Sequence, residues 1–271
     1  MEHGKSRRLA VGTKMKTKKE LGQHWLHDEL SLQAMCDIAN VSKNDYVLEI
    51  GPGLGTLTQY LVEQADRVQA VEFDADLAKD LSGRVRADNL TVTHQDILSF
   101  DLTSLPADYK VIANIPYYLT SNLIRVLSES SNPPLSATLL VQKEVAERVA
   151  ATAGDMSLLS VTAQMYFEPS LGDVVPAELF TPPPKIDSQI VHLQRRSQPL
   201  FGDMSTKHLF RVVKAGFSNR RKTLLNSLSA GLQLSKDDTR VLLESASINP
   251  IQRPQELELE QWLALAKLVK S

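Results

Sequence analysis

The segment "YVLEIGPGLGTLTQYLVEQ", residues 46–64, joins a short apolar run to a glycine-rich turn and then to a stretch with helical spacing of its apolar residues. A strand, a turn and a helix in this order are typical of the repeating unit of an open α/β sheet. The pattern recurs, in full or in its strand alone, in residues 68–85, 90–100, 110–128 and 137–151. Strands that alternate with helices predict a parallel sheet covered on both faces, so we expect a Rossmann-like α/β fold.

The chain changes character after these units. Residues 181–185, "TPPPK", contain three consecutive prolines, which exclude a helix or a central strand. Residues 187–194 could form one more strand, and from about residue 205 onward the pattern is helical. We therefore expect three parts: a flexible basic arm (1–18), a Rossmann-like domain (19–198) and a small all-α domain (199–271).

The bulk composition is ordinary for a soluble protein, since 42% of the 271 residues are hydrophobic and 23% are charged. The single cysteine, Cys36, excludes an internal disulfide bond and a cysteine-rich metal site, and we expect no metal. No apolar run approaches the roughly 18 residues that span a membrane, and the basic N-terminus lacks the apolar core of a secretory signal. We expect a cytoplasmic monomer without a membrane partner.

The net charge of −2 conceals an uneven distribution. Residues 1–27 carry a net +5 and residues 195–222 a net +7, which leaves −14 on the rest of the chain. Two basic segments on an acidic chain favour a localised surface for a polyanion, and Arg220, Arg221 and Lys222 are the candidate RNA contacts. The alternative interpretation is a solubilising tail and a solvated helix face.

Ligand-type residues stand at the ends of three successive predicted strands. Gly51, Gly53 and Gly55 form a GxGxG turn, whose backbone can approach a ligand closely. Both a dinucleotide and S-adenosyl-L-methionine are compatible with such a turn, although the spacing is not the GxGxxG that dinucleotides favour. Glu72 ends the next strand and can bind both hydroxyls of a ribose, while Asp96 ends the following strand and can accept a hydrogen bond from an adenine amino group.

A fourth strand ends in "NIPY", residues 114–117. Asn-X-Pro-Tyr can be an ordinary turn after a strand, and each acid taken alone can be a solvated surface group. Since the carboxyl ends of parallel strands meet at one edge of the sheet, four such ends in series favour a single ligand site.

These residues lie within longer motifs that resemble the ribosomal RNA adenine dimethyltransferases, from about residue 18 to residue 265. The motifs are "GQHWLHD" (22–28), "EIGPGLGTLT" (49–58), "VEFDADL" (71–77), "NIPYYLTS" (114–121), "FTPPPKIDSQIVHL" (180–193) and "GFSNRRKTLLNSL" (216–228). The last motif is similar to the small-subunit branch of the family, which dimethylates two adjacent adenosines near the 3′ end of 16S rRNA.

The resemblance implies S-adenosyl-L-methionine as cofactor, 16S rRNA in the small ribosomal subunit as partner, and a role for each matching residue. Cofactor binding is implied for Gln23, His24, Leu26, Gly51, Gly53, Glu72, Asp96 and Asn114. The catalytic tetrad is Asn114, Ile115, Pro116 and Tyr117, and Tyr117 and Phe180 are implied to stack on the target base.

The chain departs from the family pattern at several positions. His24 stands where the family usually has Asn, Trp25 where it has Phe, and Asn122 where a Pro is frequent. Residues 154–160, "GDMSLLS", replace another family motif, and we expect this change to alter a loop near the substrate. No core catalytic position is lost.

The chemistry explains the absence of a nucleophilic side chain at "NIPY", because the nucleophile is the exocyclic amine of the adenine. The side-chain oxygen of Asn114 and a neighbouring carbonyl, that of Ile115 or Pro116, can hold its N–H groups, and a loop base can reach such a pocket. Tyr118 either faces the pocket or starts the next helix. Two other functions remain open at this stage: methylation of 23S rRNA, and a ribosome-assembly factor without catalysis.

Overall fold

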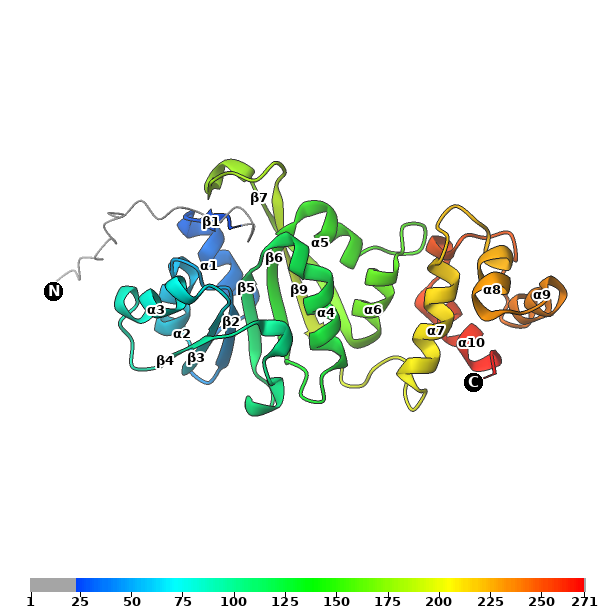
Figure 1. Cartoon of the computed structure of the whole chain (residues 1–271), viewed down its shortest axis with the longest axis horizontal. Helices are drawn as coiled ribbons and strands as arrows, with labels where there is room; N and C mark the ends of the chain where they lie inside the picture. The colour runs from blue at the N-terminus through cyan, green and yellow to red at the C-terminus, as the bar shows by residue number, and fades with distance from the viewer. Residues whose placement is uncertain (1–22, 271) are drawn as a thin grey trace.

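The computed structural model describes residues 23–270 and has the expected α/β architecture (Figure 1). Its main sheet has seven strands in the order β4-β3-β2-β5-β6-β9-β7, of which the first five are parallel and β9 is antiparallel to both of its neighbours. The strands are β2 (Tyr46–Ile50), β3 (Arg67–Glu72), β4 (Leu90–His94), β5 (Lys110–Asn114), β6 (Ser136–Gln142), β7 (Phe167–Val175) and β9 (Ser188–Arg195). The strand predicted over 187–194 is thus confirmed as β9, whereas β7 was not predicted.

Helices cover both faces of this sheet, because successive side chains point to opposite faces and both sets are buried. The helices are α1 (Glu29–Ile38), α2 (Thr56–Gln64), α3 (Ala75–Arg84), α4 (Thr120–Glu129), α5 (Lys143–Val149) and α6 (Leu158–Tyr166). Val47 and Ile112 belong to the core cluster that α1 and α2 bury, while Leu48 and Val111 belong to the cluster shared with α4, α5 and α6. Adjacent strand residues point to opposite faces, and both faces are covered, which explains why the inner parallel strands β2, β3, β5 and β6 are buried along most of their length.

The order of the strands creates a crevice between β2 and β5. The chain runs from β2 outward through β3 to β4, then returns to form β5 on the other side of β2. In open α/β sheets, ligands bind outside the carboxyl ends of the strands at such a reversal point. The turns after β2 and β5, which carry the glycines and "NIPY", therefore face each other.

A two-stranded antiparallel ribbon lies apart from the main sheet. It pairs β1 (Trp25–Leu26) with β8 (Phe180–Thr181), in the register Trp25 to Thr181 and Leu26 to Phe180. Neither strand was predicted, since each has only two residues and its partner is distant in sequence. The ribbon brings the predicted N-terminal cofactor motif beside the proline-rich segment.

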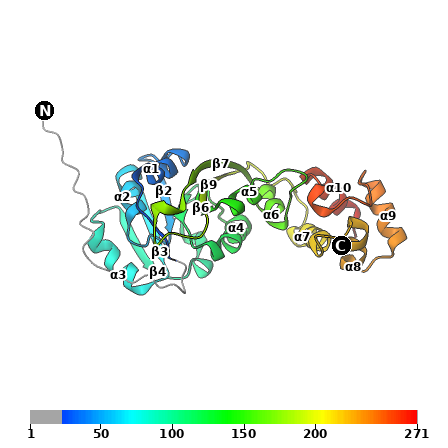
Figure 2. The same cartoon turned by 90° about the horizontal axis from the view of Figure 1, so that it is seen from above.

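The last part of the described chain is helical, as expected, with α7 (Thr206–Phe217), α8 (Leu224–Leu232), α9 (Lys236–Ser245) and α10 (Leu259–Leu268). Figures 1 and 2 both show these helices at the end of the molecule opposite α2 and α3. Their core also includes Val161 and Met165 of α6, whereas Ala163 of the same helix belongs to the sheet core. The division at residue 198 stays a prediction, because α6 contributes to both cores.

Short 3-10 turns connect several elements: η2 (Ile97–Ser99), η3 (Leu102–Ser104), η4 (Tyr117–Leu119), η5 (Ala177–Leu179) and η6 (Pro254–Glu256). The predicted basic arm over 1–18 lies outside the described residues. Among the helices of residues 23–270, none combines the length and apolarity needed to cross a membrane.

Candidate active site

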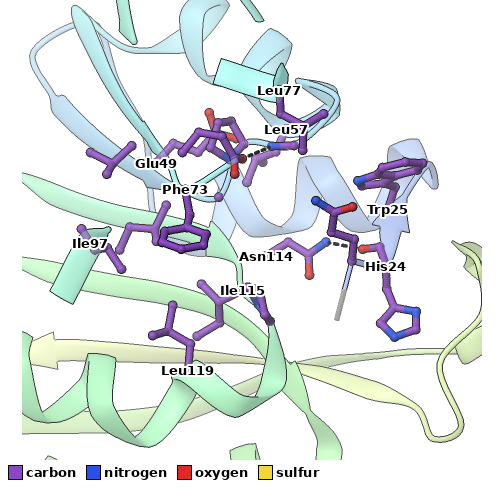
Figure 3. A pocket seen from close by; sticks show the side chains of 18 of the residues that line it. His24, Trp25, Glu49, Leu57, Phe73, Leu77, Ile97, Asn114, Ile115 and Leu119 are labelled. Atoms are coloured by element: carbon purple, nitrogen blue, oxygen red, sulfur yellow. Dashed lines mark hydrogen bonds between the residues drawn. The ribbon is translucent and has the colours of Figure 1, made fainter. Parts of the chain in front are cut away.

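One pocket opens at the reversal point of the sheet and gathers the predicted site residues from five segments (Figure 3). Its lining includes Gln23, His24, Leu26, Gly51, Gly53, Glu72, Asp96, Asn114, Ile115, Pro116 and Tyr117. These are all the residues predicted for cofactor binding and catalysis. The structure therefore brings them together.

The glycine turn is held tightly between β2 and β3. Gly51 and Gly53 have φ angles of +67° and +57°, which residues with a side chain rarely adopt. The N–H of Gly51 donates to the carbonyl of Val71 at 2.9 Å. A Cβ on Gly53 would lie 3.3 Å from Cδ1 of Trp25, so the turn also fits closely against β1. A Cβ on Gly51, in contrast, would come no closer than 4.0 Å to another segment, so there is space for a ligand beside this glycine.

Glu72 is oriented by two backbone donors. Its Oε1 accepts the N–H of Asp74 at 2.8 Å, and its Oε2 accepts the N–H of Gly53 at 3.1 Å. Burial raises the pKa of this carboxyl, while the same backbone N–H groups oppose the rise. A carboxylate held in this way presents its remaining lone pairs in a fixed direction, as a ligand of neighbouring hydroxyls requires.

Asp96 differs from Glu72 because its side chain is exposed. Its Oδ1 accepts the N–H of Leu98 at 2.9 Å and so begins the η2 turn. Phe73, which is 57% exposed, and Ile97 and Leu98 line the pocket beside it. Sequence reasoning missed these three apolar residues, although Phe73 directly follows Glu72, and Ile97 and Leu98 directly follow Asp96.

Glu49 is a further residue that the sequence analysis passed over. Its side chain is 1% exposed, it lines the pocket, and no described residue forms a hydrogen bond with its Oε2. Burial, with a smaller contribution from the charge of Glu72, raises the pKa of the carboxyl from 4.5 to about 8. An acid inside the apolar run "YVLEI" was the available signal.

The orientation of Asn114 follows from a contact with the N-terminal segment. Its Nδ2 donates to the backbone carbonyl of His24 at 3.3 Å (Figure 3). Because a carbonyl oxygen can only accept a hydrogen bond, the NH₂ group of the amide must face His24, and the amide oxygen is turned away from it. Pro116 follows with a φ of −56° and starts the η4 turn. The amide oxygen is thus held in a fixed direction on a stiff segment.

Tyr117 stands beside this amide and faces another ring. The rings of His24 and Tyr117 are nearly parallel, at 18°, with their centroids 6.0 Å apart. The Nδ1 of His24 lies 2.7 Å from the carbonyl oxygen of Pro182, which fixes the imidazole. Burial raises the pKa of Tyr117, so its hydroxyl is neutral at physiological pH.

Comparison with known proteins shows the family to which the chain belongs. A family model described as ribosomal RNA adenine dimethylase matches residues 14–271. This chain belongs to the ribosomal RNA adenine dimethylase family. It is 40% identical over 276 residues to "Ribosomal RNA small subunit methyltransferase A" of Alkaliphilus metalliredigens, with 98% of this chain and 96% of the relative covered.

Two crystal structures in the same class have similar folds. A dimethyladenosine transferase from Plasmodium falciparum gives a TM-score of 0.75 at 26% identity, covering 89% of this chain and 95% of that chain. A 23S rRNA methyltransferase gives a TM-score of 0.72 at 28% identity, covering 90% of this chain and 98% of that chain. The Rossmann-like methyltransferase fold is confirmed by both.

Phe180 is the predicted site residue that this dimethylase does not place in the pocket. It is 3% exposed, pairs with Leu26 in the β1–β8 ribbon, and packs in the core under α1. Phe180 is absent from the pocket lining. The ring that lies against Tyr117 is instead that of His24. Stacking of Phe180 on a base stays a prediction, and it would require this residue to leave the core.

The basic segment of the dimethylase presents less free charge than its composition indicates. Arg195 pairs with Asp108, Arg196 pairs with Glu168, and Arg211 donates to the carbonyl of Lys270. Arg220, Arg221 and Lys222 are exposed, but they lie on the turn between α7 and α8 and not on a helix face.

The departure at residues 154–160 lies against the helical part. The N–H groups of Gly154 and Met156 donate to the carbonyl of Gln255 at 2.8 and 3.2 Å, and Met156 is buried in the helical core.

Tyr118, in the η4 turn, is 66% exposed and lines the pocket. Of the two alternatives for Tyr118, the structure therefore shows the first, since the next helix, α4, begins only at Thr120.

We predict that Glu49→Gln changes the pH dependence of stability. Between pH 4.5 and about 8 the folded protein holds the Glu49 proton more strongly than the unfolded chain, so the free energy of unfolding falls as pH rises across this window. Glu49→Gln removes that fall and stabilises the free protein more at pH 8 than at pH 5. Urea unfolding at several pH values measures the effect.

The matched control is Glu63→Gln, which removes an exposed glutamate from α2. It should leave the difference between the two pH values as in the wild type. Parallel pH profiles for wild type and Glu49→Gln would show that Glu49 is already ionised in the folded state, contrary to our expectation.

Proposed function

We propose that this protein transfers methyl groups from S-adenosyl-L-methionine to the N6 amines of two adjacent adenosines in a loop near the 3′ end of 16S rRNA, on the small ribosomal subunit. The observation that carries the proposal is the amide oxygen of Asn114, oriented by the bond to His24 at the reversal point of the sheet. The relative named as a small-subunit methyltransferase supports the choice of RNA.

The pocket fits this cofactor on two observations. The Oε2 of Glu49 is buried and has no partner among the described residues, so a polar group of a ligand can pair with it. A Cβ on Gly51 would come no closer than 4.0 Å to another segment, which leaves space beside this glycine. Glu72 would hold the ribose and Asp96 the adenine, whose ring the apolar Phe73 and Ile97 would contact. The sulfonium of the bound cofactor supplies an activated methyl group, so the protein needs no acid for the leaving group.

The residues of "NIPY" then orient the attacking amine. The Oδ1 of Asn114 accepts one N–H, and a backbone carbonyl accepts the other. The carbonyl of Pro116 already accepts the N–H of Leu119 at 3.0 Å, which favours the carbonyl of Ile115 for this task. Two acceptors hold the amine in line with the methyl group, a proximity effect worth up to about 7–11 kcal/mol.

Tyr117 holds the base by stacking, which contributes about 1–3 kcal/mol per base. The base must be unpaired or flipped out of a helix to reach it. Arg220, Arg221 and Lys222 bind RNA phosphates from the turn between α7 and α8, two helices that Figures 1 and 2 show at the end of the molecule opposite α2 and α3. There they position the RNA without reading its sequence. A cytoplasmic monomer remains our prediction for the acting form.

The second candidate function, methylation of 23S rRNA, is favoured by the similarity to the solved 23S rRNA methyltransferase. Purified protein incubated with tritiated S-adenosyl-L-methionine and, side by side, with undermethylated 30S particles, free 16S rRNA and 50S particles separates the two. We expect label in the 30S particles. Label in the 50S particles alone would establish the second function, and binding without any transfer would establish a non-catalytic assembly factor.

We predict that Asn114→Ala lowers methyl transfer to 30S particles by about 100-fold or more, because one of the two acceptors of the amine is lost. Cofactor affinity, measured by calorimetry, should change little. The matched control is Asn122→Ala, an exposed asparagine on α4, which should transfer normally. An equal loss of cofactor affinity would identify Asn114 as chiefly a cofactor ligand.

We also predict that the double substitution Arg220→Ala and Arg221→Ala weakens RNA binding and reduces its dependence on salt. Two lost phosphate contacts lower the slope of log K against log salt concentration by about 1–2. Titration of rRNA at several salt concentrations measures this, with Lys79→Ala and Arg86→Ala, two exposed cations at or beside α3, as the control pair. An unchanged slope would exclude phosphate contacts from this turn.

A further inference from the structure

Ser188 contacts a proposed catalytic residue directly, although no role has been given to it. Its Oγ lies 2.8 Å from the hydroxyl of Tyr117. Ser188 is the first residue of β9 and is completely buried. Its backbone pairs with Gln142 of β6 on one side and with Val175 of β7 on the other. The hydroxyl of Ser188 is therefore a fixed point in the sheet.

We propose that Ser188 is a positioning residue that holds the ring of Tyr117 at the angle needed to stack on the target base. The inference rests on the proposed function, in which Tyr117 binds that base. It adds a residue from a different segment of the chain to the site, and it explains why the stacking residue is a tyrosine, whose hydroxyl can be held, where a phenylalanine would offer the same ring.

The position of Tyr117 shows why a second anchor is needed. Its backbone belongs to the single turn η4, and its ring is only partly buried. The ring of His24 has its centroid 6.0 Å away, toward the long end of the range for aromatic pairs, so this contact alone holds the Tyr117 ring less firmly than a closer stack would. A hydrogen bond at the far end of the ring limits the swing of the whole ring about the Cα–Cβ bond, because it fixes the position of the hydroxyl.

The same bond completes a set of links between the "NIPY" turn and the proline-rich segment. Asn114 donates to the carbonyl of His24, and Nδ1 of His24 meets the carbonyl of Pro182. Ser188 follows this segment and holds Tyr117. The amide of Asn114 and the ring of Tyr117 are thus both held by contacts that lead to residues 182–188. These contacts keep the amide and the ring in a constant position relative to each other.

The test is a double-mutant cycle of Ser188→Ala and Tyr117→Phe, each of which removes one hydroxyl of the bond. We expect each single variant to lower kcat for undermethylated 30S particles by about tenfold, a size typical of one lost hydrogen bond. The double variant should lose no more than either single variant, because the same bond is already absent. KM for the particles and the affinity for S-adenosyl-L-methionine should change little, since phosphate contacts and Glu72 are untouched.

A buried serine with only a structural role gives a different result. Its loss would lower stability and activity equally in the wild type and in the Tyr117→Phe variant, so that the losses of the two single variants multiply. That outcome overturns the proposal, as does full activity of Ser188→Ala. Ser136→Ala, a buried serine on β6, and Tyr109→Phe, a buried tyrosine bonded to the carbonyl of Asn132, are the matched controls and should leave kcat unchanged.

A second measurement separates this proposal from the proposed function. The chain has six tyrosines, and after labelling with 3-fluorotyrosine the ¹⁹F signal of Tyr117 is assigned by its loss in Tyr117→Phe. We expect Ser188→Ala to shift and broaden this signal while the others stay in place. If the wild type transfers no methyl group, the proposed function fails, yet a changed Tyr117 signal still supports the anchoring of the ring. An unchanged signal rejects it.

Discussion

The parallel pairing of β2 with β5 is the constraint on which the site depends. It places Val47 beside Lys110 and Glu49 beside Ile112, so that two strands more than 60 residues apart end at the same edge. A Cβ on Gly51 would consequently lie only 4.0 Å from the carbonyl oxygen of Asn114. The glycine turn and the "NIPY" turn, which are distant in sequence, become adjacent in space through this pairing.

The β1–β8 ribbon adds what the main sheet cannot supply, namely a cover over the pocket. Because Asn114 bonds to the backbone carbonyl of His24, any residue at position 24 can provide this contact. The departure from the usual family asparagine therefore leaves the orientation of Asn114 intact. What the histidine adds is a ring parallel to Tyr117 and a bond to Pro182.

Sequence reasoning succeeded where local pattern and strand order suffice. The turn at Gly51 and Gly53, Glu72 and Asn114 could all be placed at one edge because each follows an apolar strand. Non-local packing could not be predicted in this way. The edge strand β7, "FEPSLGDVV", is half exposed and contains Pro169 and Gly172, so it lacks both an apolar run and regular alternation. Phe180 lies in the core because of its pairing with Leu26, which no local motif reveals.

Charge was predicted least well, because composition does not show which cations already have partners. Arg195, Arg196 and Arg211 hold parts of this protein together, and the exposed turn at 220–222 lies in the helical part. Since α6 contributes to the cores of both the sheet and the helices, it sets the distance between that turn and the pocket. Under the proposed function, an RNA must present an unpaired adenosine at that same distance from the phosphates it offers to the turn. The acidic remainder of the chain repels RNA that cannot reach both points, so selectivity for one structured RNA follows from spacing as much as from recognition of the base.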